Sequence, residues 1–270
     1  NIKKNKKINL KAKSLKLNIF NEYIKEKNKP VEGNNIISIL NSTINTKYNI
    51  KDKLITLKSE NSKTSNFKPS YAGQLTFNPF DLDINIKLNN YEIFKLFDVN
   101  SILSEFFKSE LLINDNISIK TSIDINSKLS NKIYQKAKIN FRIVDGKMNF
   151  NNTRFINNEI GFLKLNNSNL LVENNKLFLN TDIFIEIKNS DRLFSFLNTN
   201  KKARKKIKNI MINLEYDFLS KQIKFNNIVV DNNKVSDQFF TIIEGFNDNS
   251  SNNLTKSRRL LNELLNIYKG

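Results

Sequence analysis

Apolar and polar residues alternate along most of the chain, which is the pattern of β-strands with one apolar face. The clearest stretch is GQLTFNPFDLDINIKL, from Gly73 to Leu88. Its apolar residues occupy odd positions before Asn78-Pro79 and even positions after it. Because proline cannot donate to a sheet ladder, we expect a turn or a bulge at this dipeptide. Such a break would keep both halves of the stretch facing the same side.

Similar alternating lines recur along the chain, and the longest run for about eleven to thirteen residues, against about five or six in an ordinary strand. They cover residues 8–19, 117–125, 133–143, 177–187 and 210–218. Asp145-Gly146 separates two of these lines and is a strong signal for a two-residue hairpin, because both central residues need a positive φ. Asn174-Asn175 repeats the signal. The pattern predicts long strands joined by short turns.

Four segments have helical periodicity instead, and each places apolar residues on one face. The capping residues that we expect are Asn100, Ser190 and Ser236. The segments are 100–112, 190–197, 236–246 and 256–268.

Together these elements predict a mainly β fold, in which long antiparallel meandering strands form a curved elongated groove, with a few short amphipathic helices and a C-terminal helix. We expect an N-terminal strand region at 1–70, a β-groove at 71–250 and the terminal amphipathic helix at 254–270. The chain starts inside a strand pattern, so we expect it to be a fragment that lacks an N-terminal segment.

Composition argues against catalysis. The 270 residues include no Cys and no His, which excludes a thiolate nucleophile, a Cys-based zinc site and the usual general base near neutral pH. Asp81 and Asp83 share one face of a strand, but nothing in the sequence supplies a cleft around them, and a solvated strand face is favoured. We therefore expect a protein that is not an enzyme and has no cofactor or metal site.

The formal net charge of +18 favours anionic partners such as lipid head groups or nucleic acid. Six cations gather between Lys201 and Lys208. Nucleic-acid modules usually add aromatic residues to such a face, and this segment has none, so nucleic acid is disfavoured. A solvated loop or helix end is the simpler interpretation of the cluster.

From residue 71 to residue 268 the order of segments resembles the C-terminal region of the AsmA-like family. The segments are YAGQLTFNPFDLDINIKL, INFRIVDGKMNFNNTRF, NNSNLLVENNKLFLNTDIFIEIKNSDRLFSFL and INLEYDFLSKQIKFNNIVVDN. The resemblance implies a periplasmic β-groove, anchored to the inner membrane by a segment missing from this chain. It implies that the groove carries phospholipid acyl chains toward the outer membrane, with inner- or outer-membrane proteins as possible partners. It brings no catalytic residues.

The apolar lines therefore have two interpretations. They form either the wall of a lipid-holding groove or the closed core of a structural or adhesive β-protein without a ligand. The residues that we expect to line a groove are Leu75, Phe77, Leu82, Ile84, Ile86, Ile139, Phe141, Ile143, Ile183, Ile185, Ile187, Ile212 and Leu214. The identity of the lipid, its direction of transfer and the energy source stay open.

Overall fold

A computed structural model describes residues 4–268 apart from 14–15, 65–66, 94–113, 128–132, 174–175, 219, 221, 233–236 and 249–253. The expected helix at 100–112, the Asn174-Asn175 turn and the Ser236 cap lie outside the described residues. The fold is mainly β, as the sequence predicts, with 61% of the chain in strands.

Fifteen strands and three α-helices make up the described secondary structure. The first nine strands are β1 (Lys4–Ala12), β2 (Leu17–Lys25), β3 (Val31–Ile39), β4 (Ser42–Lys51), β5 (Leu54–Ser59), β6 (Lys68–Phe77), β7 (Phe80–Tyr91), β8 (Ile117–Ser127) and β9 (Lys136–Val144). The others are β10 (Lys147–Asn149), β11 (Arg154–Asn157), β12 (Gly161–Glu173), β13 (Lys176–Ile187), β14 (Asn209–Asp217) and β15 (Gln222–Val230). The helices are α2 (Ser190–Leu197), α3 (Asp237–Asn247) and α4 (Leu254–Ile267), with a 3-10 turn η2 at Lys201–Ala203.

The strands belong to one hydrogen-bonded sheet whose order follows the chain, with β11 off the main path beside β12. One pair departs from the predicted antiparallel meander, because β7 and β8 are parallel. The other pairs with a described register are antiparallel. A parallel pair cannot be joined by a tight hairpin, which agrees with the 25 residues that separate β7 from β8 in the sequence.

The break at Asn78-Pro79 is a hairpin turn, which confirms the expectation of a turn there. The peptide bond is cis, and β6 pairs with β7 so that Leu75 lies opposite Leu82. The Thr76 hydroxyl donates to the Pro79 carbonyl over 2.9 Å. The antiparallel register therefore brings the odd positions of β6 and the even positions of β7 onto one face.

Asp145 and Gly146 form the predicted two-residue turn, with φ values of 51° and 66°. The predicted range of α2, 190–197, is confirmed, but its predicted cap is wrong by one residue. Asn189 rather than Ser190 caps this helix, accepting a hydrogen bond from the Arg192 amide over 3.1 Å. The Ser190 hydroxyl instead donates to the Ile207 carbonyl, which ties the helix to the segment before β14.

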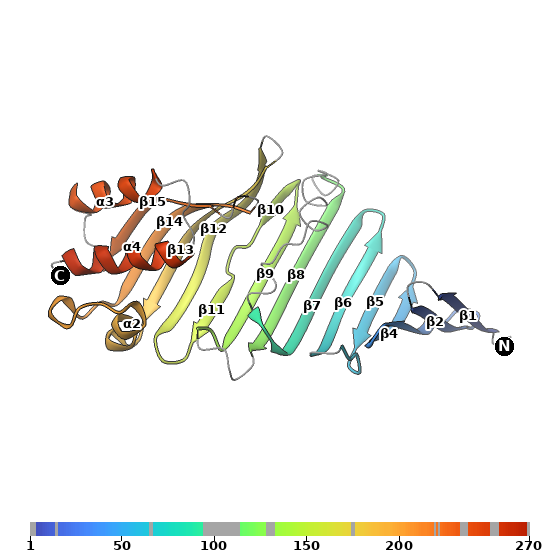
Figure 1. Cartoon of the computed structure of the whole chain (residues 1–270). Coiled ribbons are helices and arrows are strands. Elements are labelled where there is room, and N and C mark those ends of the chain that lie inside the picture. Colours follow the sequence, from blue (N-terminus) through green and yellow to red (C-terminus); the bar gives the residue numbers. More distant parts are fainter. Residues whose placement is uncertain are drawn as a thin grey trace. The chain divides into compact units, whose positions relative to one another are not determined.

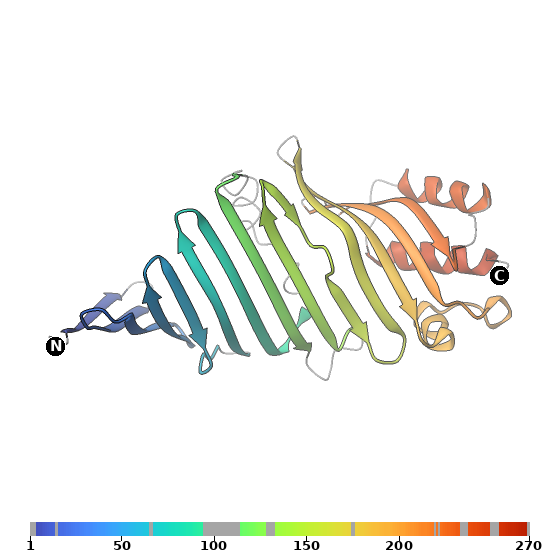
Figure 2. The same cartoon turned by 180° about the vertical axis from the view of Figure 1, so that it is seen from behind.

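The chain divides into two compact units. Unit 1 comprises residues 1–95, 113–132 and 136–146, and unit 2 comprises 96–112, 133–135 and 147–270. Residue 70 lies within β6 of unit 1. Figure 1 and Figure 2 show the strands β2 to β9 of unit 1 side by side.

The core of unit 2 lies between the sheet and the three helices. One face of β13 to β15 packs against α2, α3 and α4, which Figure 1 shows at the C-terminal end of the chain. Leu193, Phe194 and Leu197 come from α2, Phe239 and Ile243 from α3, and Leu260, Leu264 and Leu265 from α4. The C-terminal helix is therefore part of a closed core rather than a separate element.

The outer edge of β15 is closed by the end of α3. The Asn247 side chain accepts a hydrogen bond from the Phe225 amide over 3.0 Å and donates one to the Phe225 carbonyl over 2.7 Å. A side-chain amide thus replaces the peptide group of a further strand. Such pairing satisfies backbone groups that an exposed edge would otherwise offer to another chain.

Replacement of Asn247 by Ala should lower the free energy of unfolding by about 1–3 kcal/mol, because the half-buried amide and carbonyl of Phe225 lose their partners. Chemical denaturation followed by circular dichroism measures the change. Asn227→Ala is the matched control, since Asn227 is an exposed amide on the same strand. Equal stability of the two variants would contradict the role of Asn247 at this edge.

Candidate functional site: the apolar face of the sheet

The register places most apolar residues of unit 1 on one face, with Phe20, Ile24 and Ile36 on the other. Residues directly opposite each other on paired strands share a face. One such row crosses the first four strands and another crosses β5 to β9. The rows are Leu10, Ile19, Ile37 and Ile44, and then Ile55, Leu75, Leu82, Ile119 and Ile143.

All eight candidate residues of unit 1 lie on this face, which we call the apolar face. Ile139 and Ile143 are buried, and Phe77 is 67% exposed. The others are half-buried, namely Leu75, Leu82, Ile84, Ile86 and Phe141. The exposed fraction of the side chains thus differs widely along the apolar face.

The apolar face is unevenly covered along unit 1. Among the described residues of β1 to β6, no Ala, Val, Ile, Leu, Met, Phe or Tyr side chain is buried. Leu10 is 61% exposed at the edge strand. Buried members begin at Leu88 in β7 and continue with Ile125 in β8 and Ile139 in β9. The described residues therefore leave the apolar face of β1 to β6 only partly covered.

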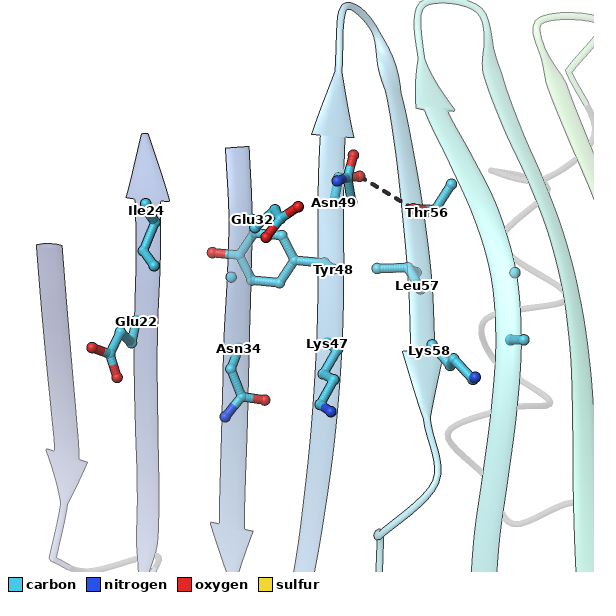
Figure 3. Close-up of a pocket in the computed structure, with 13 residues that line it drawn as sticks. Glu22, Ile24, Glu32, Asn34, Lys47, Tyr48, Asn49, Thr56, Leu57 and Lys58 are labelled. Carbon is cyan, nitrogen blue, oxygen red and sulfur yellow. Dashed lines mark hydrogen bonds between the residues drawn. The ribbon is translucent and has the colours of Figure 1, made fainter. Parts of the chain in front are cut away.

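Charged side chains of the opposite face, which we call the polar face, border an open hollow of about 680 Å³, and Tyr48 and Leu57 of the apolar face border it too (Figure 3). Glu22, Glu32, Lys47 and Lys58 border this hollow, and the register assigns them to the face opposite Tyr48 and Leu57. A hydrogen bond from Asn5 and, secondarily, the Lys7 ammonium lower the pKa of the Glu22 carboxyl.

Tyr48 organises part of the apolar face. Its ring reaches across β3, as Figure 3 shows, and its hydroxyl donates to the Asn21 side chain on β2 over 3.0 Å. Gly33 lies opposite Tyr48, and a Cβ there would come within 2.3 Å of the Tyr48 ring. The absent side chain at position 33 therefore lets one tyrosine connect β4 to β2.

Gly33→Val should lower the free energy of unfolding by about 1–3 kcal/mol, because the new side chain must displace the Tyr48 ring. Thermal or chemical denaturation measures the effect. Gly245→Ala is the control, since a Cβ at this position meets no atom within 4 Å. In the Tyr48→Ala background the cost of Gly33→Val should fall, and an unchanged cost would show that the ring is not the cause.

The same register argument holds within unit 2. One row joins Leu165, Ile183, Ile212 and Ile228, and the next joins Leu163, Ile185, Ile210 and Val230. The five candidate residues of this unit share one face. Ile187, Ile212 and Leu214 are buried in the core under the helices, whereas Ile183 and Ile185 are half-buried.

Ile183 and Ile185 are half-buried because a cavity of about 250 Å³ lies between this face and the helices. Its walls include residues that the sequence did not mark as lining, among them Tyr134, Phe196 and Leu261. Burial raises the pKa of the Tyr134 phenol, whose ring lies 5.4 Å from that of Phe155. Ile133, expected within an alternating strand line, precedes β9 and borders this cavity.

In the part of the chain that the structure describes, no three acidic side chains lie close enough together to hold a metal ion. Asp81 and Asp83 alternate with the apolar residues of β7 and lie on the polar face. Over the same described residues, no helix has the length and apolar character that crossing a membrane requires.

Comparisons of the chain with family models, with curated proteins and with solved structures find no significant match. The resemblance to the AsmA-like family thus depends on the order of segments in the sequence alone.

Proposed function

We propose that the protein is a non-enzymatic component of a bacterial envelope whose apolar sheet face holds phospholipid acyl chains. The observation that carries this proposal is the apolar face of β1 to β6, which the described residues cover only partly and on which Ile, Leu and Tyr side chains form rows across the strands. The absence of Cys and His from the sequence agrees with a function that needs no catalytic group.

Soluble proteins rarely leave large apolar patches in water, so a sheet face without a second protein layer needs another cover.

Hydrocarbon chains fit such a surface. Each acyl CH₂ that leaves water contributes about 0.8 kcal/mol, and this gain needs no directional contact. A row of Ile and Leu along several strands would therefore hold acyl chains without selecting one head group. The resemblance to the AsmA-like family suggests where this happens: in the periplasm, between the inner and outer membranes, with membrane proteins at one or both ends.

One observation favours the alternative, a structural β-protein with a closed core. Over β13 to β15 the protein's own helices cover most of the apolar face, and Ile210, Phe194 and Leu264 are almost fully buried. If the rest of the face were sealed similarly, no lipid would be needed.

Organic extracts of the protein, purified without detergent from bacterial cells, should contain phospholipid when examined by mass spectrometry. Leu75→Glu should remove most of this lipid, because a carboxylate against hydrocarbon is strongly unfavourable. Gln74→Glu is the control, since it adds the same charge to the opposite face of the same strand.

Circular dichroism must show that both variants remain folded. If the wild-type protein contains no lipid, the closed-core alternative is supported. Lipid that remains in folded Leu75→Glu would show that the apolar face is not where the acyl chains bind.

A further inference from the structure

The cavity of unit 2 has walls from three parts of the fold. The sheet contributes Ile183, Ile212 and Leu214, α2 contributes Phe196, and α4 contributes Leu261. All of these residues belong to unit 2, so the cavity lies within one compact unit. Its volume of about 250 Å³ lies below the usual range for drug-sized ligands, about 300–1,000 Å³, so it is suited to one alkyl chain rather than to a whole diacyl lipid.

The walls of this cavity are almost entirely hydrocarbon. The polar side chains among its described lining residues are those of Tyr134, Asn157 and Ser257. The Asn157 side chain already has hydrogen-bond partners: its NH₂ group donates to the Ile133 carbonyl, and its oxygen accepts from the Glu159 and Ile160 amides. A buried water needs two to four polar partners, which these walls do not readily offer. An alkyl chain is the chemical group that the cavity suits.

The guanidinium group of Arg258 lies beside Phe196, an exposed residue of the cavity wall. Phe196 borders the cavity and is 38% exposed, and the Arg258 guanidinium lies 4.9 Å from the centre of its ring. Arg258 also donates to the Phe196 carbonyl. No carboxylate of the described residues forms an ion pair with Arg258. A guanidinium has five N–H donors, so donors remain for an anion at this position.

We infer that the cavity beneath α4 binds a single alkyl chain whose anionic head group pairs with Arg258. This inference rests on the proposed function and makes it more specific: unit 2 takes one chain of an anionic amphiphile at a site of limited size. The head group is a carboxylate or a phosphate, because both match the donor geometry of arginine. A free fatty acid and a lysophospholipid are two sources of this chemistry.

Isothermal titration of the whole chain, stripped of lipid, with laurate, with a lauroyl lysophosphatidylglycerol and with neutral monolaurin tests the head-group assignment. Arg258→Gln should weaken binding of an anionic ligand by about tenfold or more, and should change monolaurin binding little. Arg259→Gln is the matched control, because neither arginine lines the cavity and only Arg258 lies over the ring of Phe196, whereas Arg259 is exposed on α4.

A larger loss for laurate or for the lysophospholipid identifies the source of the head group. If Arg258→Gln leaves the affinity for both anionic ligands unchanged, or weakens monolaurin binding equally, the ion pair is wrong.

Leu261→Trp tests the cavity itself. The indole should fill the space and reduce laurate binding by about tenfold or more, because a filled pocket no longer buries the chain. Phe240→Trp is the control, since Phe240 is exposed on α3 and does not line the cavity. Ile183→Phe, from the sheet side, repeats the test if Leu261→Trp does not fold.

Unchanged laurate binding in a folded cavity variant would overturn this site. The proposed function fails by a different result, namely a phospholipid content that Leu75→Glu leaves unchanged. Leu75 lies in unit 1 and does not border this cavity, so the two failures are distinguishable.

Discussion

The constraint on which the structure depends is that the long strands place most of their apolar side chains on the same side of the sheet. Such a face must be covered, because exposed apolar surface is costly in water. Unit 2 covers it with its own helices over β13 to β15. Over β1 to β6 the described residues provide no comparable layer, and the apolar side chains there stay half-buried or exposed. Hydrocarbon from lipid is the covering that we propose for this part.

The charged residues of the polar face and the protected edges of the sheet limit where another molecule can bind. The opposite face carries Glu22, Glu32 and several lysines, which favour solvent over hydrocarbon. At the C-terminal edge Asn247 occupies the backbone groups of Phe225. At the N-terminal edge β1 is exposed along its length and rich in lysine, which opposes pairing with further strands.

The sequence predicted those features that local patterns determine. Alternation identified the strands and their common face, and Asp145-Gly146 and Asn78-Pro79 marked turns because their backbone requirements are local. The cap of α2 was misplaced by one residue, since Asn189 and Ser190 are both good capping residues and only the contact of Ser190 with Ile207 separates them. The parallel β7–β8 pair was missed because strand direction after a long connection depends on non-local packing. Tyr134 and Leu261 meet at the cavity from distant segments, and no sequence pattern joins them.

Photo-crosslinking tests most directly whether hydrocarbon contacts the apolar face. A photoreactive phenylalanine analogue would replace Ile86, on the apolar face, or Lys87, its exposed neighbour on the polar face of β7. After irradiation in cells, mass spectrometry of the purified protein should find phospholipid adducts at position 86 and few at position 87. A lack of adducts at position 86, or an equal abundance of adducts at both positions, would contradict the account.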